Sequence, residues 1–136
     1  MYLVDTNVWL ELLLEQERTS EVRRFLESVD ADQLSMTEFA LNSIGLITTR
    51  LRKQDVFEAF ISDILENSAV RRICLSASDL RRALSIMNKF HLDFDDAYQY
   101  VAAERNGLVL VSFDADFDRT DMKRKVPADL LDSGLI

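Results

Sequence analysis

The sequence predicts an α/β fold, specifically a three-layer α/β/α sandwich around a central parallel sheet. Two observations predict it. Short and almost wholly apolar runs recur along the 136 residues, and an amphipathic helical pattern separates each run from the next. Strands that are apolar on both faces are typical of parallel sheets, because helices cover such sheets on both sides.

The expected strands are four short apolar runs, of which LVLVS is the clearest. They cover Tyr2–Val4, Leu34–Met36, Ile73–Leu75 and Leu108–Ser112. Between them, apolar residues recur every three or four positions, which predicts helices with one buried face. These stripes comprise Val22, Phe25, Leu26 and Val29; Ala40, Ile44, Ile47 and Leu51; Phe57, Phe60, Ile61 and Ile64; Leu80, Ala83, Leu84 and Met87; and Ala97, Tyr100 and Val101.

The composition is that of an ordinary folded domain. Hydrophobic residues make up 48% and charged residues 29%, with only 3 Gly and 1 Pro, so we expect a single domain over residues 1–136. No apolar run is long enough for a membrane span, and the first residues lack the pattern of a signal peptide. The single cysteine, Cys74, excludes an internal disulfide, fits a cytoplasmic protein and is expected in the core.

Acidic residues occupy four places where strands are expected to end or helices to begin. Asp5 follows the first strand, Glu38 follows the second, and Asp114 with Asp116 follows the last. The segment DFDD at 93–96 opens the helix that precedes the last strand. Ligand sites of parallel sheets form at the carboxyl ends of the strands, so we expect these acids to converge there.

Each acid taken alone also has a structural explanation, as a helix cap or a turn residue. The helix cap would be Asp5, the pairs with capping-box spacing are Ser35 with Glu38 and Asp96 with Gln99, and the turn residues are Asp114 and Asp116.

The four positions together favour a metal site over capping alone. Neighbouring carboxylates repel one another, by roughly 4 kcal/mol per pair at about 4 Å where the effective dielectric constant is about 20. A bound cation removes that penalty. Carboxylate ligands without a supporting His or Cys cluster favour Mg²⁺ or Mn²⁺ over zinc, and such ions promote hydrolysis of phosphodiesters. A phosphate-binding glycine-rich loop is absent from the sequence, which argues against a P-loop nucleotide site.

The chain resembles the PIN-domain ribonucleases, and in size the VapC toxins of prokaryotic toxin–antitoxin pairs. The resemblance covers essentially the whole chain and rests on four segments in order: VDTNVWLELL, SMTEFALNSIG, FDDAYQYVAAERNG and LVLVSFDADFDR. It implies an endoribonuclease that depends on Mg²⁺ or Mn²⁺. Asp5, Asp96 and Asp114 would be metal ligands with catalytic roles, and Asp116 would complete the metal site. Glu38 would be catalytic, binding the metal directly or through water and orienting the nucleophile.

The resemblance also assigns supporting residues and partners. Thr6 and Asn7 match a hydroxyl–amide pair that would hold Asp5, and Ser112 stands where the family usually has threonine. Members of the family commonly form homodimers and are inhibited by a cognate antitoxin, which is often basic. The net charge of −8 suits a basic partner, although it is unusual for a protein that binds RNA.

Other residues have structural explanations that compete with functional ones. The basic segment KRK, Lys123, Arg124 and Lys125, could grip RNA phosphates, but solvated helix faces explain most such clusters. Trp9, Phe39 and Phe60 fall on apolar positions, so we expect them in the core rather than as platforms for RNA bases.

Three other functions remain open at the level of sequence. A haloacid dehalogenase-type phosphatase would need a second Asp two residues after Asp5, where this chain has Asn7. A receiver domain would need paired acids after the first strand and a Lys after the last, whereas this chain has Asp5 alone and Phe113-Asp114 at these places. A non-catalytic PIN-like scaffold that binds a partner protein fits the sequence as well, but it leaves the four acidic positions unexplained.

Overall fold

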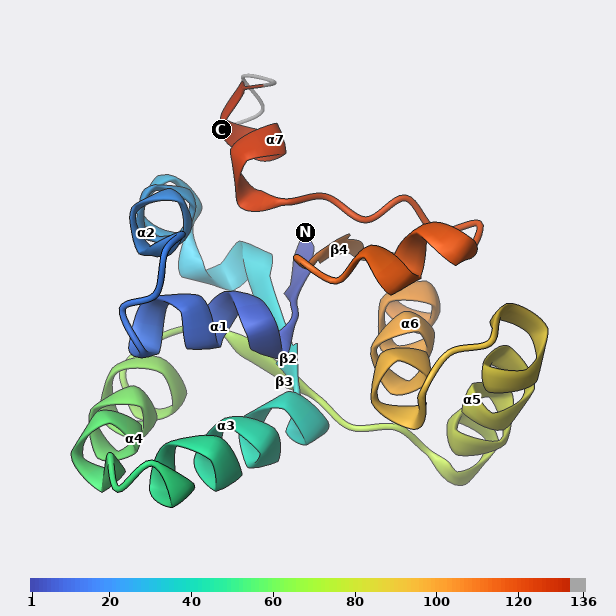
Figure 1. The fold of residues 1–136 in the computed structure, drawn as a ribbon, viewed down its shortest axis with the longest axis horizontal. Coiled ribbons are helices and arrows are strands. Elements are labelled where there is room, and N and C mark those ends of the chain that lie inside the picture. Colours follow the sequence, from blue (N-terminus) through green and yellow to red (C-terminus); the bar gives the residue numbers. More distant parts are fainter. Residues whose placement is uncertain (133–136) are drawn as a thin grey trace.

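The computed structural model describes residues 1–132 and places four parallel strands in one sheet, in the order β3-β2-β1-β4 (Figure 1). Their bounds are β1 (Tyr2–Val4), β2 (Leu34–Thr37), β3 (Arg71–Ile73) and β4 (Val109–Val111). The two central strands, β1 and β2, pair with Leu3 opposite Ser35, and β1 pairs with β4 with Leu3 opposite Leu110. Because all strands run in one direction, their carboxyl ends meet at one edge of the sheet.

Helices cover both faces of this sheet, which confirms the three-layer α/β/α prediction (Figure 1). One face carries α1 (Thr6–Leu13), α2 (Thr19–Ser28), α3 (Glu38–Arg50) and α4 (Gln54–Phe60), which continues into the π-helical turn η2 (Ile61–Glu66). The other face carries α5 (Ala77–Phe90) and α6 (Phe94–Asn106). The remaining short elements are η1 (Ala31–Gln33), η3 (Ala115–Arg119) and α7 (Pro127–Asp132).

Two separate cores lie above and below the sheet, because successive strand residues point to opposite faces. Leu3 and Leu110 pack with the apolar residues of α5 and α6. Their neighbours Val4 and Val111 pack with those of α1 to α4, where Trp9 is fully buried. Both sides of the central strands are thus buried, as the apolar runs predicted.

The edge of the sheet differs from the prediction. The third strand spans Arg71–Ile73 rather than Ile73–Leu75; it lies at the edge of the sheet, and two of its three residues are exposed. Cys74 is exposed, so its expected place in the core is wrong; its neighbours Ile73 and Leu75 are the buried residues of this segment. Leu84 is 55% exposed, since α5 buries Ala83 and Ile86 instead. No helix within residues 1–132 is long and apolar enough to span a membrane.

Candidate functional site

The acidic residues after β1 and β4 meet because these two strands are neighbours in the sheet. Asp5 follows β1, Asp114 follows β4, and the first turn of α6 brings Asp95 and Asp96 to the same place. All four carboxylates line one pocket of about 260 Å³. The predicted convergence of Asp5, Asp96 and Asp114 is therefore present in the structure.

Asp5 lies at the base of this pocket and is only 5% exposed. Its Oδ1 accepts hydrogen bonds from the Thr6 backbone N–H at 2.8 Å and from Gln99 Nε2 at 2.9 Å. Its Oδ2 accepts one from Ser112 Oγ at 2.7 Å. Asp5 is also the N-cap of α1, so the capping explanation and a role in the site are compatible.

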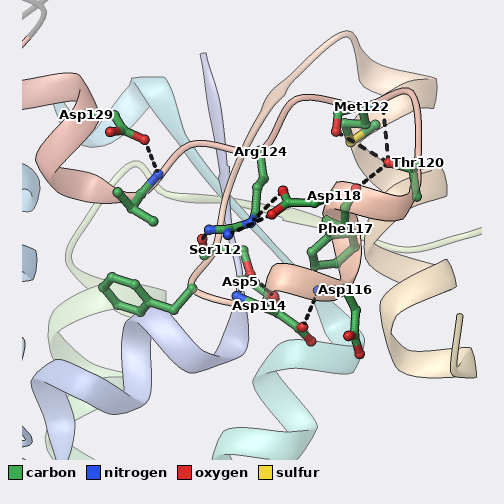
Figure 2. A network of polar contacts seen from close by, with 12 residues as sticks. Asp5, Ser112, Asp114, Asp116, Phe117, Asp118, Thr120, Met122, Arg124 and Asp129 are labelled. Carbon is green, nitrogen blue, oxygen red and sulfur yellow. Dashed lines mark hydrogen bonds and ion pairs between the residues drawn. The ribbon is translucent and has the colours of Figure 1, made fainter.

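Ser112 connects Asp5 with Asp114 across the ends of β1 and β4 (Figure 2). The Ser112 hydroxyl is fully buried, donates to Asp5, and accepts from the Asp114 backbone N–H at 3.0 Å. Asn7 Nδ2 donates to the same hydroxyl at 3.3 Å, and Asn7 Oδ1 accepts from the Phe113 backbone N–H at 3.1 Å. Thr6 contributes its backbone N–H. These contacts place the three predicted supporting residues around Asp5.

Asp96, Asp114 and Asp116 form a second feature of the site, in which carboxylate oxygens of the three residues lie within 4.8 Å of one another. Burial first, and then the negative charges of Asp114, Asp95 and Asp5, together raise the pKa of Asp96 to about 8. Burial also raises the pKa of Asp5, although its hydrogen bonds oppose the change. Carboxylates gathered this closely, with Asp96 buried among them, form an arrangement that a divalent cation would stabilise.

Asp116 lies at the exposed side of this cluster. Its backbone N–H donates to Asp114 Oδ1 at 2.9 Å, so Asp114 does act as a turn residue at the start of η3. Its own carboxylate forms an ion pair with Arg119 at 2.8 Å. The ion pair uses Oδ1 of Asp116.

Glu38 is not among the residues that line the pocket within the described part of the chain. Its carboxylate faces Arg72 on the edge strand, at 3.7 Å from Nη1. The expected capping box between Ser35 and Glu38 is wrong, because Thr37 caps α3 by accepting from the Ala40 backbone N–H at 2.9 Å. Glu38 thus pairs with Arg72 and does not line the pocket that Asp5, Asp96 and Asp114 share.

Gln99 is a site residue that the sequence analysis did not identify as one. It is buried, donates to Asp5, and its Oε1 accepts from the Thr37 hydroxyl at 2.6 Å. It therefore joins the end of β1 to the end of β2. Asp93 is the N-cap of α6, so the expected capping box of Asp96 with Gln99 is wrong. The three-residue spacing instead places Asp96 and Gln99 on the same face of α6, because residues three apart share one face of a helix.

The KRK segment lies outside this pocket. Arg124 is 18% exposed in its side chain and pairs through two nitrogens with Asp118, at 3.1 Å each. It also donates to the Ser112 carbonyl at 3.1 Å (Figure 2). The Lys125 backbone pairs with Leu110 and Ser112, which extends the sheet beside β4. Lys123 lines a separate surface hollow together with Arg124 and Lys125.

The sequence profile of the PIN domain family matches residues 2–123. The chain belongs to the PIN domain family. Solved structures with the same fold include the VapC20 toxin of Mycobacterium tuberculosis, described as cleaving the sarcin–ricin loop, with a TM-score of 0.80 and 19% identity over 93% of this chain and 100% of that one.

Two further structures are similar to this PIN domain. FitAcB from Neisseria gonorrhoeae has a TM-score of 0.75 and 21% identity over 94% of this chain and 99% of that one. A toxin–antitoxin complex from Klebsiella pneumoniae has a TM-score of 0.75 and 17% identity, covering 93% and 98% of the two chains. At these identities the likeness shows the fold alone. Among curated proteins the chain has no detectable match.

Proposed function

We propose that this PIN-domain protein is an endoribonuclease that depends on Mg²⁺ or Mn²⁺ and hydrolyses RNA phosphodiester bonds. The observation that carries the proposal is the convergence of Asp96, Asp114 and Asp116 beside the buried Asp5. Two neighbouring strands and the start of α6 position Asp5, Asp96 and Asp114 in a single pocket, and Asp116 joins Asp96 and Asp114 at its side. A fold gains nothing in stability from gathering like charges in this way, so a function is the better explanation.

The residues present fit a divalent ion. The donor set is made of carboxylate oxygens, which Mg²⁺ and Mn²⁺ prefer, and the pKa of Asp96 is raised by its burial and by neighbouring negative charges that a cation would neutralise. Asp5, Asp96, Asp114 and Asp116 would hold the ion. When bound, such an ion supplies Lewis acidity for phosphodiester hydrolysis. The side chains of Ser112 and Gln99 keep the Asp5 carboxylate in one orientation, as supports of metal ligands generally do.

The same proposal extends to partners. The similar structures include toxins and toxin–antitoxin complexes, which supports a role as the toxin of such a pair, inhibited by an antitoxin protein. The net charge of −8 suits a basic antitoxin. We also propose one domain over residues 1–136, a homodimer as in the related family, and a cytoplasmic location.

The decisive experiment is cleavage of a mixed pool of tRNA and rRNA by the purified protein in Mg²⁺, Mn²⁺ or EDTA. We expect cleavage that needs the metal and is lost in the double variant Asp5→Asn with Asp96→Asn. Asp55→Asn is the matched control, because Asp55 is an exposed acid on α4, away from the pocket. Thermal unfolding of the same samples reports metal binding independently, since an ion that binds the folded protein raises its melting temperature. Stabilisation by metal without cleavage would favour a non-catalytic, partner-binding PIN protein.

A further inference from the structure

The pocket that holds the acids is also lined by apolar side chains, among them an aromatic ring. Phe39 lines it together with Leu10 and Ile47, and these three come from α1 and α3 rather than from the acid-bearing segments. Phe39 is only partly buried, unlike the core aromatics Trp9 and Phe60. We propose that Phe39 is a stacking platform for the RNA base beside the scissile phosphate. The inference rests on the proposed ribonuclease function.

The Phe39 ring is held in place by two neighbouring aromatic rings. Its centroid lies 5.3 Å from that of Tyr98 and 6.0 Å from that of Phe94, with interplanar angles of 40° and 65°. Tyr98 is itself anchored, because its hydroxyl accepts from the Leu75 backbone N–H at 3.3 Å. A ring that is already fixed loses little conformational entropy when a base stacks on it.

This aromatic cluster continues from the pocket to the surface. Phe94 begins α6, two residues before Asp96, and is 37% exposed. Phe94 and Tyr98 also contact each other, with ring centroids 6.2 Å apart. Asp96 of the acid cluster and Phe94 and Tyr98 of the aromatic cluster thus lie close together on α6, and Phe39 lines the same pocket as Asp96 and Asp114, so a nucleotide whose phosphate lies at the acids has its base within reach of Phe39.

Stacking also explains how an acidic protein can hold RNA. With a net charge of −8, and with Arg72, Arg119 and Arg124 engaged in ion pairs, contacts to phosphates offer little general attraction. Stacking on an aromatic ring does not depend on net charge and is available to every base. It does require a free base face, which a nucleotide inside a duplex does not present. Among nucleic acids, the geometry thus favours single strands, loops and bulges.

The test uses a short single-stranded RNA with 2-aminopurine, a base whose fluorescence falls when it stacks. Binding is measured in Ca²⁺ and in Mg²⁺, with the RNA checked on a gel to be intact. We expect Phe39→Leu to weaken binding roughly 5- to 100-fold and to abolish the fluorescence change. Phe39→Trp should retain both. Phe90→Leu is the matched control, because Phe90 is a partly buried aromatic on α5 that contacts Tyr100 and does not line the pocket.

An RNA with an abasic nucleotide in place of 2-aminopurine separates stacking from a structural effect. Phe39→Leu and the wild type should bind this RNA equally, whereas a distorted site would weaken it further. Mn²⁺ affinity of Phe39→Leu should equal that of the wild type. Equal binding of the base-containing RNA by both proteins, with cleavage intact, would overturn the inference and leave the nuclease standing. A wild type that neither binds nor cuts RNA would overturn both.

Discussion

The hydroxyl of Ser112 donates a hydrogen bond of 2.7 Å to the carboxylate of Asp5, although 107 positions separate the two residues in the chain. The parallel pairing of β1 with β4, in which Val4 lies opposite Val111, places the next residue of each strand side by side. The contact therefore results directly from the register of the sheet. It holds the first acid of the site against the strand that delivers Asp114.

We expect Ser112→Ala to lower the free energy of unfolding by about 1–3 kcal/mol, because the buried Asp5 carboxylate loses its 2.7 Å hydrogen bond from the hydroxyl and the Asp114 backbone N–H loses the hydroxyl as its acceptor. Ser112→Thr keeps the hydroxyl and is the matched control, which should lose less stability than Ser112→Ala. Denaturant unfolding in EDTA measures both. An alanine variant as stable as the wild type would show that water replaces the hydroxyl without cost.

The pKa of Asp96 predicts how the metal-free protein responds to pH. Burial and neighbouring acids raise this pKa from 3.8 to about 8, so the folded state binds the proton more tightly than the unfolded state. The stabilisation by this proton is complete below about pH 4 and is lost as pH rises toward 8. One proton changes the free energy of unfolding by at most about 1.4 kcal/mol per pH unit.

Asp96→Asn should therefore unfold at a higher temperature than the wild type at pH 8 in EDTA, and the difference should shrink steadily toward pH 4. Added Mn²⁺ should stabilise the wild type most at high pH, where the carboxylate is ionised, and should stabilise Asp96→Asn much less. Melting curves from pH 4 to about 9 test both statements, with Asp55→Asn as control. Parallel pH profiles of the wild type and Asp96→Asn would contradict the assigned pKa.

Gln99 provides a separate test of how Asp5 is positioned. Its amide donates to Asp5 and accepts from Thr37, so the isosteric change Gln99→Glu places a carboxylate 2.9 Å from that of Asp5. We expect this variant to be more destabilised at pH 8 than at pH 5 and to bind Mn²⁺ with altered affinity. Gln99→Met keeps the volume without the charge, and its loss of stability should depend less on pH. Identical behaviour of the two variants would argue against charge as the cause.

The sequence was sufficient to predict the parts of the fold that repeat a simple pattern. Apolar runs located β1, β2 and β4, because strands buried on both faces must be apolar throughout. The sequence was less informative at β3, because two of its three residues, Arg71 and Arg72, are exposed and charged and so do not form an apolar run. Ligand sites of parallel sheets form at the carboxyl ends of the strands, and this rule predicted that Asp5, Asp96 and Asp114 lie together, as they do in the pocket.

What the sequence could not provide was the direction of individual side chains. Gln99 and Phe39 reach the pocket because of how α6 and α3 are rotated about their axes, and a helical pattern alone leaves that rotation open within a broad stripe. Glu38 forms an ion pair with Arg72, and Arg124 forms one with Asp118. Neither pairing could be predicted from the local spacing of the residues. Residue types and their positions along the chain predicted an acidic site, but tertiary packing determines which side chains reach it.

Arg124 is expected to act through structure rather than by binding RNA. It donates to the Ser112 carbonyl and pairs with Asp118 through two nitrogens, a geometry that lysine cannot reproduce. Arg124→Lys should therefore lower the melting temperature by a few degrees, and the neutral variant Arg124→Gln should leave the salt dependence of RNA binding unchanged. Neutral replacement of Lys123 is the control, since this residue would test phosphate contacts without disturbing Ser112. A reduced salt dependence in Arg124→Gln would restore this arginine as an RNA contact.

Glu38 is the predicted catalytic residue whose position is hardest to reconcile with a direct role at the metal. Its carboxylate pairs with Arg72 and it does not line the pocket, whereas Asp114 does. We therefore expect Glu38→Gln to keep the Mn²⁺ affinity of the wild type within about 2-fold, while Asp114→Asn lowers it at least about 10-fold, a difference of about 1.4 kcal/mol. Calorimetric titration of both variants with Mn²⁺ makes the comparison, and Arg72→Gln shows whether the ion pair matters. A loss of Mn²⁺ affinity in Glu38→Gln as large as in Asp114→Asn would mean that the side chain leaves Arg72 to bind the metal.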